Sequence, residues 1–497
     1  MKSQSNEAFL AFDLGAESGR AVLGRLEAGT IKIEEIHRFP NTPLRLSGHI
    51  FWNIYGLVEE IKKAMIRCRK RLGQPPSSIG LDTWGVDFGL LARDGSVLGL
   101  PYCYRDRRTE GVMEDYLKLV PPRSLYEATG IQFLPFNTLF QLYSMVRDRS
   151  PLLDAASALL FMPDLFNYLL TGRKACEFTI ASTSQMLDPR TRKWQPGLFQ
   201  AMGLSKRLLL EVTEPGRVLA PLAADTAQET GLGPTPVITV AGHDTASAVA
   251  AVPARGENWA YISSGTWSLV GIETKIPVIT ADACEKNFTN EGGVAGTTRF
   301  LKNVTGLWLL QSFRKSWAGG RDFSYEDLTA GARTAPAFEC LIDPDHHSFL
   351  NPSDMVGAIK AFCLLTNQKP PATAAGFARA IFESLALKYR LVLDDLKSIT
   401  SQAINVIHIT GGGSKNELLC RFTAEATGIP VLAGPAEAAS IGNLALQAMA
   451  LGAVKDIQEA RLIIGRSFKP KLYEPTGDPA WEKALSKFRN ITGRVNG

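Results

Sequence analysis

The sequence predicts an α/β protein with two similar domains that face each other across a cleft. Two strand–turn–strand patterns, at 9–26 and 258–273, lie about 250 residues apart and predict the repetition. Segments at 237–250 and 404–426 pass from an apolar strand into a helix, which predicts the α/β class. At 497 residues the chain is also too long for one compact core, so two domains are expected.

The first pattern, FLAFDLGAESGRAVLGRL, is predicted to be a β-hairpin with Asp13 and Ser18 at its tip. The apolar residues on both sides suit strands, and the break between them is short. A strand followed by a strand excludes a P-loop and a Rossmann fingerprint, because both of those place a helix N-terminus against the phosphates.

The second pattern, NWAYISSGTWSLVGIE, is predicted to be a hairpin with its turn at 263–266. Small hydroxyl residues and glycine leave room for backbone N–H groups to converge on an anion. Two such turns could hold a phosphate chain from opposite sides. For either hairpin alone, an ordinary turn is the alternative.

A third element begins with a strand over 404–409 and continues through three glycines at 411–413 into a helix. We predict that Ser414 and Glu417 form a capping box that starts this helix. A triple-glycine turn lets a flat ligand such as adenine lie directly on the backbone. The predicted inward face of the helix consists of Leu418, Leu419, Phe422 and Ala426.

A candidate acid lies between the two hairpins, where a strand over 237–240 leads into the sequence GHDT at 242–245. An acid at the carboxyl end of a strand, beside a helix N-terminus, is where an α/β protein presents catalytic groups. The alternative is that Asp244 only caps the helix. His243 has no second histidine at metal-binding spacing, so no metal site is predicted there.

Composition and charge exclude several classes of protein. Hydrophobic residues make up 45% and charged residues 21% of the chain, as in ordinary globular proteins. The net charge of +5 is small, and no run of five or six like charges occurs. The basic stretch around Arg67 continues a helical pattern, which favours a solvated helix face over a nucleic-acid site.

Cysteine usage and the N-terminal sequence predict the cellular compartment. The seven cysteines are scattered and contain no Cys-x-x-Cys pair, which favours reduced thiols and argues against a zinc site. The first strand begins too early to leave room for a signal sequence, and no apolar run reaches the roughly 18 residues of a membrane span. We therefore expect a cytoplasmic protein with no nucleic-acid and no membrane partner.

Nine sequence motifs occur in a fixed order over roughly residues 9–442. They are DLGAESGR, DTWGVDFGLL, YRDRRTEG, TGIQFLPFNTLFQL, GHDTASAV, SSGTWSL, NEGG, LKNVTGLWLLQ and GGGSKNELL. In this order they resemble the FGGY family of carbohydrate kinases, and the ordered set is stronger support than any single motif. The resemblance implies two actin-like (ribonuclease-H-type) domains, at 1–250 and 251–497, with an interdomain cleft between them.

The resemblance also implies the reaction and its cofactors. The expected reaction transfers the γ-phosphoryl group of ATP to the 1-hydroxyl of L-rhamnulose, with Mg²⁺ as the metal. The alternatives are a member of the family that acts on another sugar, such as a fuculokinase or a xylulokinase, and an actin-like nucleotide-binding protein without sugar chemistry. We expect the ketose and ATP as small-molecule partners, and either a monomer or a homodimer.

Residue roles follow from the same resemblance. Asp244 is implied to be the general base, with His243 and Thr245 orienting the sugar. Asp13 is implied to hold Mg²⁺ through water, because Mg²⁺ keeps much of its hydration shell. Glu17 stands where many members of the family carry a hydroxyl residue, so it is expected to face the metal or the solvent. The implied phosphate contacts are Ala16, Glu17, Ser18, Gly19, Arg20 and Thr266.

The remaining implied contacts are divided between the sugar and the nucleotide. Gly85 would let the sugar approach the backbone, and Asp82 and Asp87 would accept hydrogen bonds from its hydroxyl groups. Asn303 is also implied to contact the sugar. The implied nucleotide contacts are Gln311 and Gly412.

Overall fold

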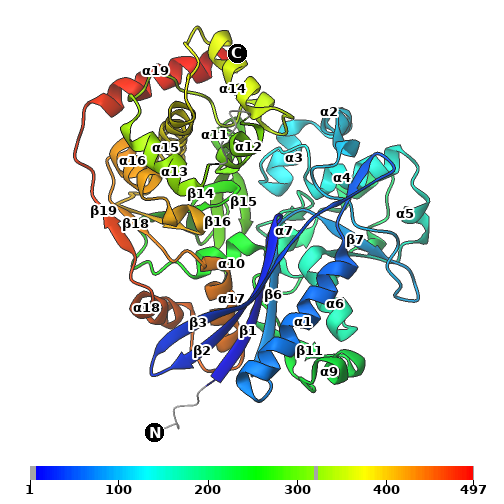
Figure 1. Ribbon diagram of the computed structural model, residues 1–497. Coiled ribbons are helices and arrows are strands. Elements are labelled where there is room, and N and C mark those ends of the chain that lie inside the picture. The colour runs from blue at the N-terminus through cyan, green and yellow to red at the C-terminus, as the bar shows by residue number, and fades with distance from the viewer. Residues whose placement is uncertain (1–6, 318–322, 496–497) are drawn as a thin grey trace. The chain divides into compact units, whose positions relative to one another are not determined.

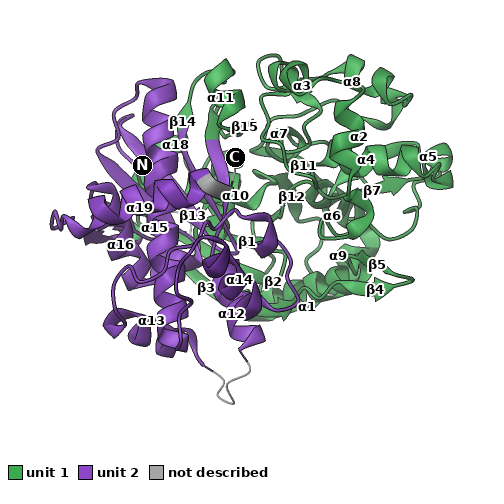
Figure 2. Cartoon of the chain, turned by 90° about the horizontal axis from the view of Figure 1, so that it is seen from above, with its two compact units in different colours: residues 1–253, 273–300, 438–467 green, residues 254–272, 301–437, 468–497 purple. Residues whose placement is uncertain are grey.

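The computed structural model describes residues 7–317 and 323–495, and the chain divides into two compact units (Figure 1). Unit 1 consists of residues 1–253, 273–300 and 438–467, and unit 2 of residues 254–272, 301–437 and 468–497 (Figure 2). Each unit is therefore assembled from three separate segments of the chain. The domain boundary at residue 250 stays a prediction.

Unit 1 is built on a six-stranded sheet with the order β11-β12-β6-β1-β2-β3. The first hairpin is confirmed, because β1 and β2 pair in antiparallel fashion. On its other side β1 pairs in parallel with β6, and β6 pairs in parallel with β12. The strands are β1 (Glu7–Leu14), β2 (Ser18–Glu27), β3 (Thr30–Pro40), β6 (Ser78–Thr83), β11 (Arg217–Pro221) and β12 (Pro236–Thr239).

Helices pack on both faces of this sheet. Alternate residues of β1 point to opposite faces, and Leu10 and Phe12 share one buried core with residues of α1 and α6. Asp13 points to the other face, where Ser440 of α17 donates a hydrogen bond to it. The helices are α1 (Ile54–Leu72), α6 (Met162–Thr171), α9 (Ala224–Thr230), α10 (Asp244–Ala250), α17 (Ala438–Ala450) and α18 (Ile457–Ser467).

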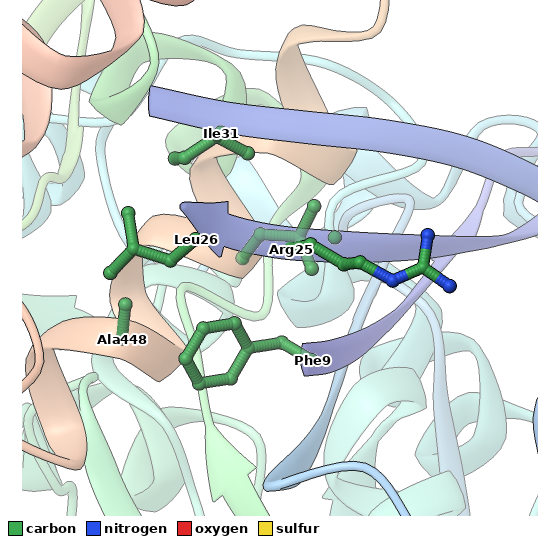
Figure 3. Close-up of a pocket in the computed structure, with 7 residues that line it drawn as sticks. Phe9, Arg25, Leu26, Ile31 and Ala448 are labelled. Carbon is green, nitrogen blue, oxygen red and sulfur yellow. The ribbon is translucent and has the colours of Figure 1, made fainter. Parts of the chain in front are cut away.

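A small apolar pocket lies where α17 meets the strands β1, β2 and β3 (Figure 3). It is lined by Phe9, Gly24, Arg25, Leu26, Ile31, Leu444 and Ala448. The charged end of Arg25 points away from the other labelled side chains. Because a ligand site needs a few convergent polar groups, we assign this pocket to packing between the helix and the sheet.

The chain between β6 and β11 adds a second core to unit 1, formed largely by buried residues from 88 to 208. Short helices and strands surround it, and the strands form two separate two-stranded sheets, β7-β8 and β10-β9. These elements are β7 (Phe88–Leu91), η1 (Arg107–Thr109), α2 (Val112–Leu117), α3 (Pro122–Thr129), α4 (Thr138–Arg147), α5 (Pro151–Ala155), β8 (Ala158–Phe161), α7 (Phe178–Ser182), β9 (Leu187–Asp188), β10 (Lys193–Trp194), α8 (Pro196–Ala201) and η2 (Lys206–Leu208).

Unit 2 repeats the central part of this sheet with the strand order β14-β13-β17-β18-β19. The second hairpin is confirmed by the antiparallel pair β13–β14, and β13 also pairs in parallel with β17. The orientations along β14-β13-β17-β18-β19 match those along β2-β1-β6-β12-β11, as two ribonuclease-H-type units require. The strands are β13 (Trp259–Ser264), β14 (Trp267–Thr274), β17 (Val406–Thr410), β18 (Val431–Ala433) and β19 (Lys471–Tyr473).

The long helix of unit 2, α15 (Ala374–Thr400), buries the apolar residues that its sequence spaces about four apart, among them Phe377, Leu385 and Leu396. The other helices of unit 2 are α12 (Trp308–Ser316), α13 (Tyr325–Thr334), η3 (His347–Phe349), α14 (Met355–Leu365), η4 (Gly412–Lys415), α16 (Glu417–Thr427) and α19 (Ala480–Val495). The remaining elements of the chain are β4 (Leu44–Leu46), β5 (His49–Phe51), α11 (Ala281–Glu285), β15 (Thr289–Gly292) and β16 (Thr298–Thr305).

The capping box predicted at Ser414 and Glu417 is wrong. The 3₁₀ turn η4 extends the glycine loop, and within it the Ser414 hydroxyl donates to the carbonyl of Gly411 (2.7 Å). Asn416 caps α16 instead, by accepting a hydrogen bond from the backbone N–H of Leu419 (2.9 Å). The predicted inward face of α16 is confirmed by the burial of Leu418, Leu419, Phe422 and Ala426.

Helices α10 and α17 cross at a glycine. A Cβ added to Gly442 would lie 1.8 Å from the carbonyl oxygen of Ser247, so only a residue without a side chain fits at this contact. Since α17 carries polar side chains that reach β1 and β6, the close approach of the two helices also positions those side chains.

We predict that Gly442→Ala lowers the free energy of unfolding by about 1–3 kcal/mol, because the added methyl group forces α10 and α17 apart. The measurement is urea unfolding followed by circular dichroism. Gly197→Ala is the matched control, because nothing lies within 4 Å of the added Cβ in α8, and it should leave stability unchanged or slightly raised. Equal stability of the two variants would contradict this packing.

Candidate active site

The turn between β1 and β2 is the first predicted phosphate loop. The N–H of Gly15 donates to the carbonyl of Ser18 (3.0 Å), and Asn41 holds the turn by donating from Nδ2 to the carbonyl of Gly15 (2.9 Å). Glu17 is exposed at the tip, whereas Ala16 and Ser18 are half-buried. The exposure of Glu17 agrees with the solvent-facing orientation, which avoids placing its charge against a phosphate.

The two ends of this loop are fixed by the protein. Gly19 is buried against the ring of Phe39, since an added Cβ would lie 2.3 Å from the ring carbon Cε2. Arg20 follows on β2 and lies opposite Asp13 across the hairpin, with Nε 3.2 Å from Asp13 Oδ2. The guanidinium of Arg20 therefore lies at the base of the loop, beside the carboxylate that was predicted to hold the metal.

Three acidic side chains belong to the carboxyl ends of the parallel strands of unit 1. Asp13 of β1 and Asp82 of β6 occupy paired positions, and Asp244 begins α10 after β12. Burial raises the pKa of Asp82 well above its ordinary value, and the neighbouring charge of Asp13 raises it further. Burial also raises the pKa of Asp244, whereas His243 acts in the opposite direction.

Asp244 does not cap α10. The N-cap residue is His243, and Asp244 is the first residue of the helix. The Asp244 side chain keeps 30% of its surface exposed and accepts a hydrogen bond at Oδ1 from the Thr245 hydroxyl (3.1 Å). An acid that is partly exposed and is not used as a cap is available for chemistry.

Helix α17 supplies polar partners to the two buried carboxylates. Asn443 donates from Nδ2 to Asp82 Oδ2 (2.6 Å), and the Ser440 hydroxyl donates to Asp13 Oδ2 (3.4 Å). Sequence reasoning missed both residues. The available signal was the polar series Ser440, Asn443 and Gln447, which follows one face of an otherwise apolar helix.

The donor set around Asp13 fits a hard divalent cation. Across residues 7–317 and 323–495, no group of three or more histidine, cysteine or acidic side chains could hold a metal by itself. Mg²⁺ needs no such group, because it binds one or two carboxylates and completes its shell with water and phosphate oxygens. Asp82 Oδ1 is buried without a hydrogen-bond partner among the described residues, which leaves one more acceptor atom beside Asp13.

His243 lies between Asp244 and a buried ion pair. Its Nε2 is 3.5 Å from Asp244 Oδ1, and its Nδ1 is 3.0 Å from Nη2 of the fully buried Arg299. Arg299 Nη2 also donates to Glu291 Oε2 (3.0 Å). Glu291 belongs to the motif NEGG, for which the sequence predicts no role, and no sequence motif includes Arg299.

Gly85 borders the same histidine. A Cβ added to Gly85 would lie 3.4 Å from His243 Nε2, so any side chain at this position would crowd the ring nitrogen. The structure thus brings together four of the predicted sugar contacts, Gly85, His243, Asp244 and Thr245, at the end of the parallel strands in unit 1.

Glu177 fixes the loop that carries His243 and Asp244. Its carboxylate accepts hydrogen bonds from the hydroxyl of Thr179 (2.6 Å) and from the N–H groups of Thr179 (2.8 Å), Ile180 (3.1 Å) and Gly242 (2.9 Å). Burial raises the pKa of Glu177 to about 7. Nothing in the local sequence distinguishes Glu177 from a surface acid, so only the folded chain reveals its position.

Asp87 is buried in a cage of donors. Its Oδ2 accepts from Nε1 of Trp52 (2.6 Å), Nε1 of Trp84 (3.0 Å) and the N–H of Tyr104 (3.1 Å), and its Oδ1 accepts from Nε2 of Gln141 (2.8 Å). A carboxylate has about four lone-pair sites. Three donors already occupy Oδ2 and one occupies Oδ1, so holding the surrounding side chains fits Asp87 better than the predicted contact with a sugar hydroxyl.

In unit 2, the turn between β13 and β14 is joined to the start of α12. The carbonyl of Thr266 accepts hydrogen bonds from the N–H groups of Gly306 (3.1 Å) and Trp308 (3.1 Å), and the carbonyl of Gly265 accepts from Leu307 (2.9 Å). The Thr266 side chain remains half-buried at the tip of the hairpin. These bonds hold the second predicted phosphate turn against the helix that carries Gln311.

The three glycines after β17 have different surroundings. Gly411 has a φ of +77°, and a Cβ added to it would lie 2.8 Å from the carbonyl oxygen of Ser264. At Gly413 the same addition would lie 2.0 Å from the Ser264 hydroxyl, whereas nothing lies within 4 Å at Gly412. The outer two glycines therefore pack on the second hairpin, and Gly412 is the one that borders open space.

The last two predicted contacts also belong to unit 2. Gln311 is on α12, and its Oε1 is buried without a hydrogen-bond partner among the described residues. Asn303 is half-buried on β16. Thr266, Gln311 and Gly412 thus lie on connected elements of unit 2, whereas the other predicted site residues except Asn303 lie in unit 1.

No helix within the described residues is long and apolar enough to span a membrane. The repeated hairpin-led sheet and the acidic side chains at its strand ends define an actin-like protein of two α/β units. Residues 8–251 match the N-terminal domain, and residues 260–451 the C-terminal domain, of the FGGY family of carbohydrate kinases.

Relatives and solved structures agree with this match. A rhamnulokinase from Bacteroides thetaiotaomicron is 47% identical over 482 residues, which cover 97% of this chain and 99% of that protein. A rhamnulokinase from Enterococcus faecalis is 42% identical, covering 95% and 96% of the two chains. The chain belongs to the FGGY family of carbohydrate kinases, and it is an enzyme of the sugar-kinase class.

Solved structures with low sequence identity support the fold alone. A gluconate kinase from Lactobacillus acidophilus superimposes with a TM-score of 0.82 at 16% identity, covering 99% of this chain and 98% of that one. A glycerol kinase from Plasmodium falciparum, solved with ADP, gives a TM-score of 0.77 at 15% identity, covering 98% of both chains.

The buried carboxyl of Glu177 makes stability depend on pH. Its pKa of about 7 lies above the ordinary value of 4.5, so the folded state binds this proton more tightly than the unfolded state does. The stabilisation is complete below pH 4.5 and is lost as the pH rises through 7. We predict that the free energy of unfolding falls by roughly 3 kcal/mol from this group alone between pH 4.5 and 8.

The measurement is urea unfolding at pH 5, 6, 7 and 8 for the wild type and for Glu177→Gln, which cannot titrate. The stability of the variant should depend less steeply on pH than that of the wild type. Asp87, whose pKa burial raises to about 6, contributes with the same sign in both proteins. Parallel profiles for the two proteins would show that Glu177 is ionised across this range.

Proposed function

We propose that this chain transfers the γ-phosphoryl group of ATP to the 1-hydroxyl of L-rhamnulose, forming L-rhamnulose 1-phosphate. The support for this substrate is the set of relatives named rhamnulokinase, which are 39–47% identical over nearly their whole length. The observation that carries the reaction is the position of Asp244, a partly exposed acid at the start of α10 with a raised pKa.

Asp244 is the proposed general base. Its Oδ1 accepts from the Thr245 hydroxyl and faces His243 Nε2, so Oδ2 is the oxygen that takes the proton of the attacking hydroxyl. A raised pKa favours this step, because a more basic carboxylate takes up a proton more readily. As the proton leaves, the sugar oxygen attacks the γ-phosphorus in line with the departing ADP.

The sugar is held by the residues around Asp244. His243 and Thr245 orient its hydroxyl groups, and the missing side chain of Gly85 leaves room for the ring or chain beside His243. Positioning supplies much of the rate in phosphoryl transfer, because the protein has little covalent chemistry to perform. Asp82 and Asn303 complete the proposed sugar contacts.

The nucleotide contacts follow the two hairpins and the glycine turn. Backbone N–H groups of 16–20 and the hydroxyl of Thr266 bind the phosphates, while Gln311 and Gly412 bind the nucleoside. Mg²⁺, held through water by Asp13, would neutralise charge on the phosphate oxygens. The unpartnered Oε1 of Gln311 and the open space at Gly412 support these assignments.

We predict that Asp244→Asn folds and binds L-rhamnulose. Its kcat should fall by a factor of about 10² to 10⁴, because an amide cannot accept the proton. The measurements are steady-state kinetics and calorimetric titration of the sugar. Asp225→Asn is the matched control, because Asp225 also lies in the first turn of a helix, α9, but outside the site. Wild-type kcat for Asp244→Asn would show that Asp244 is not the base.

The proposed substrate is tested with a panel of ketoses. ADP release is measured by a coupled assay with L-rhamnulose, L-fuculose and D-xylulose, and the product is identified by ³¹P NMR. We expect the highest kcat/KM for L-rhamnulose and a phosphate monoester at C1. A higher value for L-fuculose or D-xylulose would replace the proposed substrate with that sugar. ATP hydrolysis without any sugar phosphate would favour the actin-like alternative without sugar chemistry.

A further inference from the structure

The side chain of Arg299 is fully buried and makes hydrogen bonds with His243, the residue before Asp244, and with β15. Its side chain is 0% exposed. Nε donates to the carbonyl of Gly292 (2.8 Å), and Nη2 lies 3.0 Å from both Glu291 Oε2 and His243 Nδ1. The two hydrogens of Nη2 are thus directed at two different acceptors, one of them the imidazole ring.

We infer that Arg299 is a positioning residue that fixes His243 in the tautomer with its proton on Nε2. A guanidinium is always protonated and has no acceptor atom. A nitrogen of His243 at 3.0 Å from Nη2 must therefore present a lone pair. In the neutral ring the proton is then on Nε2, because the hydrogen bond made by one nitrogen selects the tautomer of the other.

Glu291 is the competing partner of the same nitrogen. Its Oε2 lies 3.3 Å from His243 Nδ1, and a proton on Nδ1 could be donated to it. That arrangement would point the Nδ1 hydrogen into the region occupied by Arg299 Nη2, which is closer. Glu291 Oε2 already accepts from Arg299, so a neutral histidine with an unprotonated Nδ1 leaves His243 Nδ1, Glu291 Oε2 and Arg299 Nη2 each with a partner.

The fixed tautomer has a consequence for the sugar, and this step rests on the proposed function. A proton on Nε2 points toward Asp244 Oδ1 and the space beside Gly85. His243 therefore acts only as a donor there and selects a sugar oxygen that can accept. An Nδ1-protonated ring would offer a lone pair at Nε2 instead. That lone pair could accept from a sugar hydroxyl but would reject a carbonyl or ether oxygen, which has no hydrogen to donate.

The first measurement is the ¹⁵N spectrum of the protein labelled with ¹⁵N-histidine, in the absence of ligands. The signals of His243 are assigned as those absent from His243→Asn. We expect a protonated Nε2 and an unprotonated Nδ1 in the wild type and also in Glu291→Gln. A protonated Nδ1 in the wild type would overturn the inference. A reversal of the tautomer in Glu291→Gln would also overturn it, because Glu291 and not Arg299 would then select the tautomer.

The second measurement removes the arginine without leaving a buried charge unpaired. In the double variant Arg299→Met with Glu291→Gln, His243 should populate both tautomers, and KM for the ketose should rise about tenfold, the effect of one hydrogen bond. Arg299→Lys should recover part of both effects. An unchanged tautomer and KM in the double variant would overturn the inference.

Arg461 provides the matched control. It is buried in unit 1 and donates from Nη2 to Glu273 Oε2 (2.8 Å) and to the carbonyl of Val249 (3.2 Å), so its chemistry resembles that of Arg299. Arg461→Met with Glu273→Gln should cost similar stability but leave the His243 tautomer and KM unchanged. If the wild type shows the Nε2 proton but no activity with L-rhamnulose, the proposed substrate fails and the role of Arg299 stands.

Discussion

The pairing of Asp13 with Asp82 across β1 and β6 is the contact on which the rest of unit 1 depends. Two carboxylates side by side repel each other, and burial makes the repulsion stronger. The fold accommodates them with donors from two elements: Arg20 from the hairpin, and Ser440 and Asn443 from α17. Electrostatics therefore requires a helix from the far end of the sequence at this position.

The same requirement connects packing with chemistry. Because α17 must approach the sheet closely, it crosses α10 at a glycine, and α10 is the helix that begins with Asp244. Behind this loop, Glu177 binds the N–H of Gly242 and Arg299 binds the ring of His243. The residues proposed to meet the substrate are thus held by buried charged groups, whose own partners leave them little freedom to move.

Local features could be predicted from the sequence. Each hairpin is specified within a short stretch by apolar strands and a small turn, and the periodic apolar residues of α15 and α16 define their buried faces. The capping prediction at Ser414 failed because the glycine loop continued into a 3₁₀ turn. The capping-box pattern alone does not show whether Ser414 starts α16 or belongs to the 3₁₀ turn before it.

Contacts between distant residues could not be predicted in this way. Asn443 is 361 positions from Asp82, and Arg299 is 56 positions from His243, so no spacing rule connects them. Asp87 is the opposite case, because an acid in a recognised motif suggests a ligand contact, whereas its donors suggest a structural role. Its four donors come from segments that only the folded chain brings together.

The interleaving of the two units in the sequence constrains how the protein is made. Residues 438–467 belong to unit 1, although the preceding stretch from 301 to 437 belongs to unit 2. During synthesis on a ribosome, the nascent sheet of unit 1 must wait for α17 before Asp13 and Asp82 gain their partners Ser440 and Asn443. Native unit 1 is therefore completed only after residues 438–467 have emerged, and a fragment ending near residue 253 would leave the α17-facing side of its sheet uncovered.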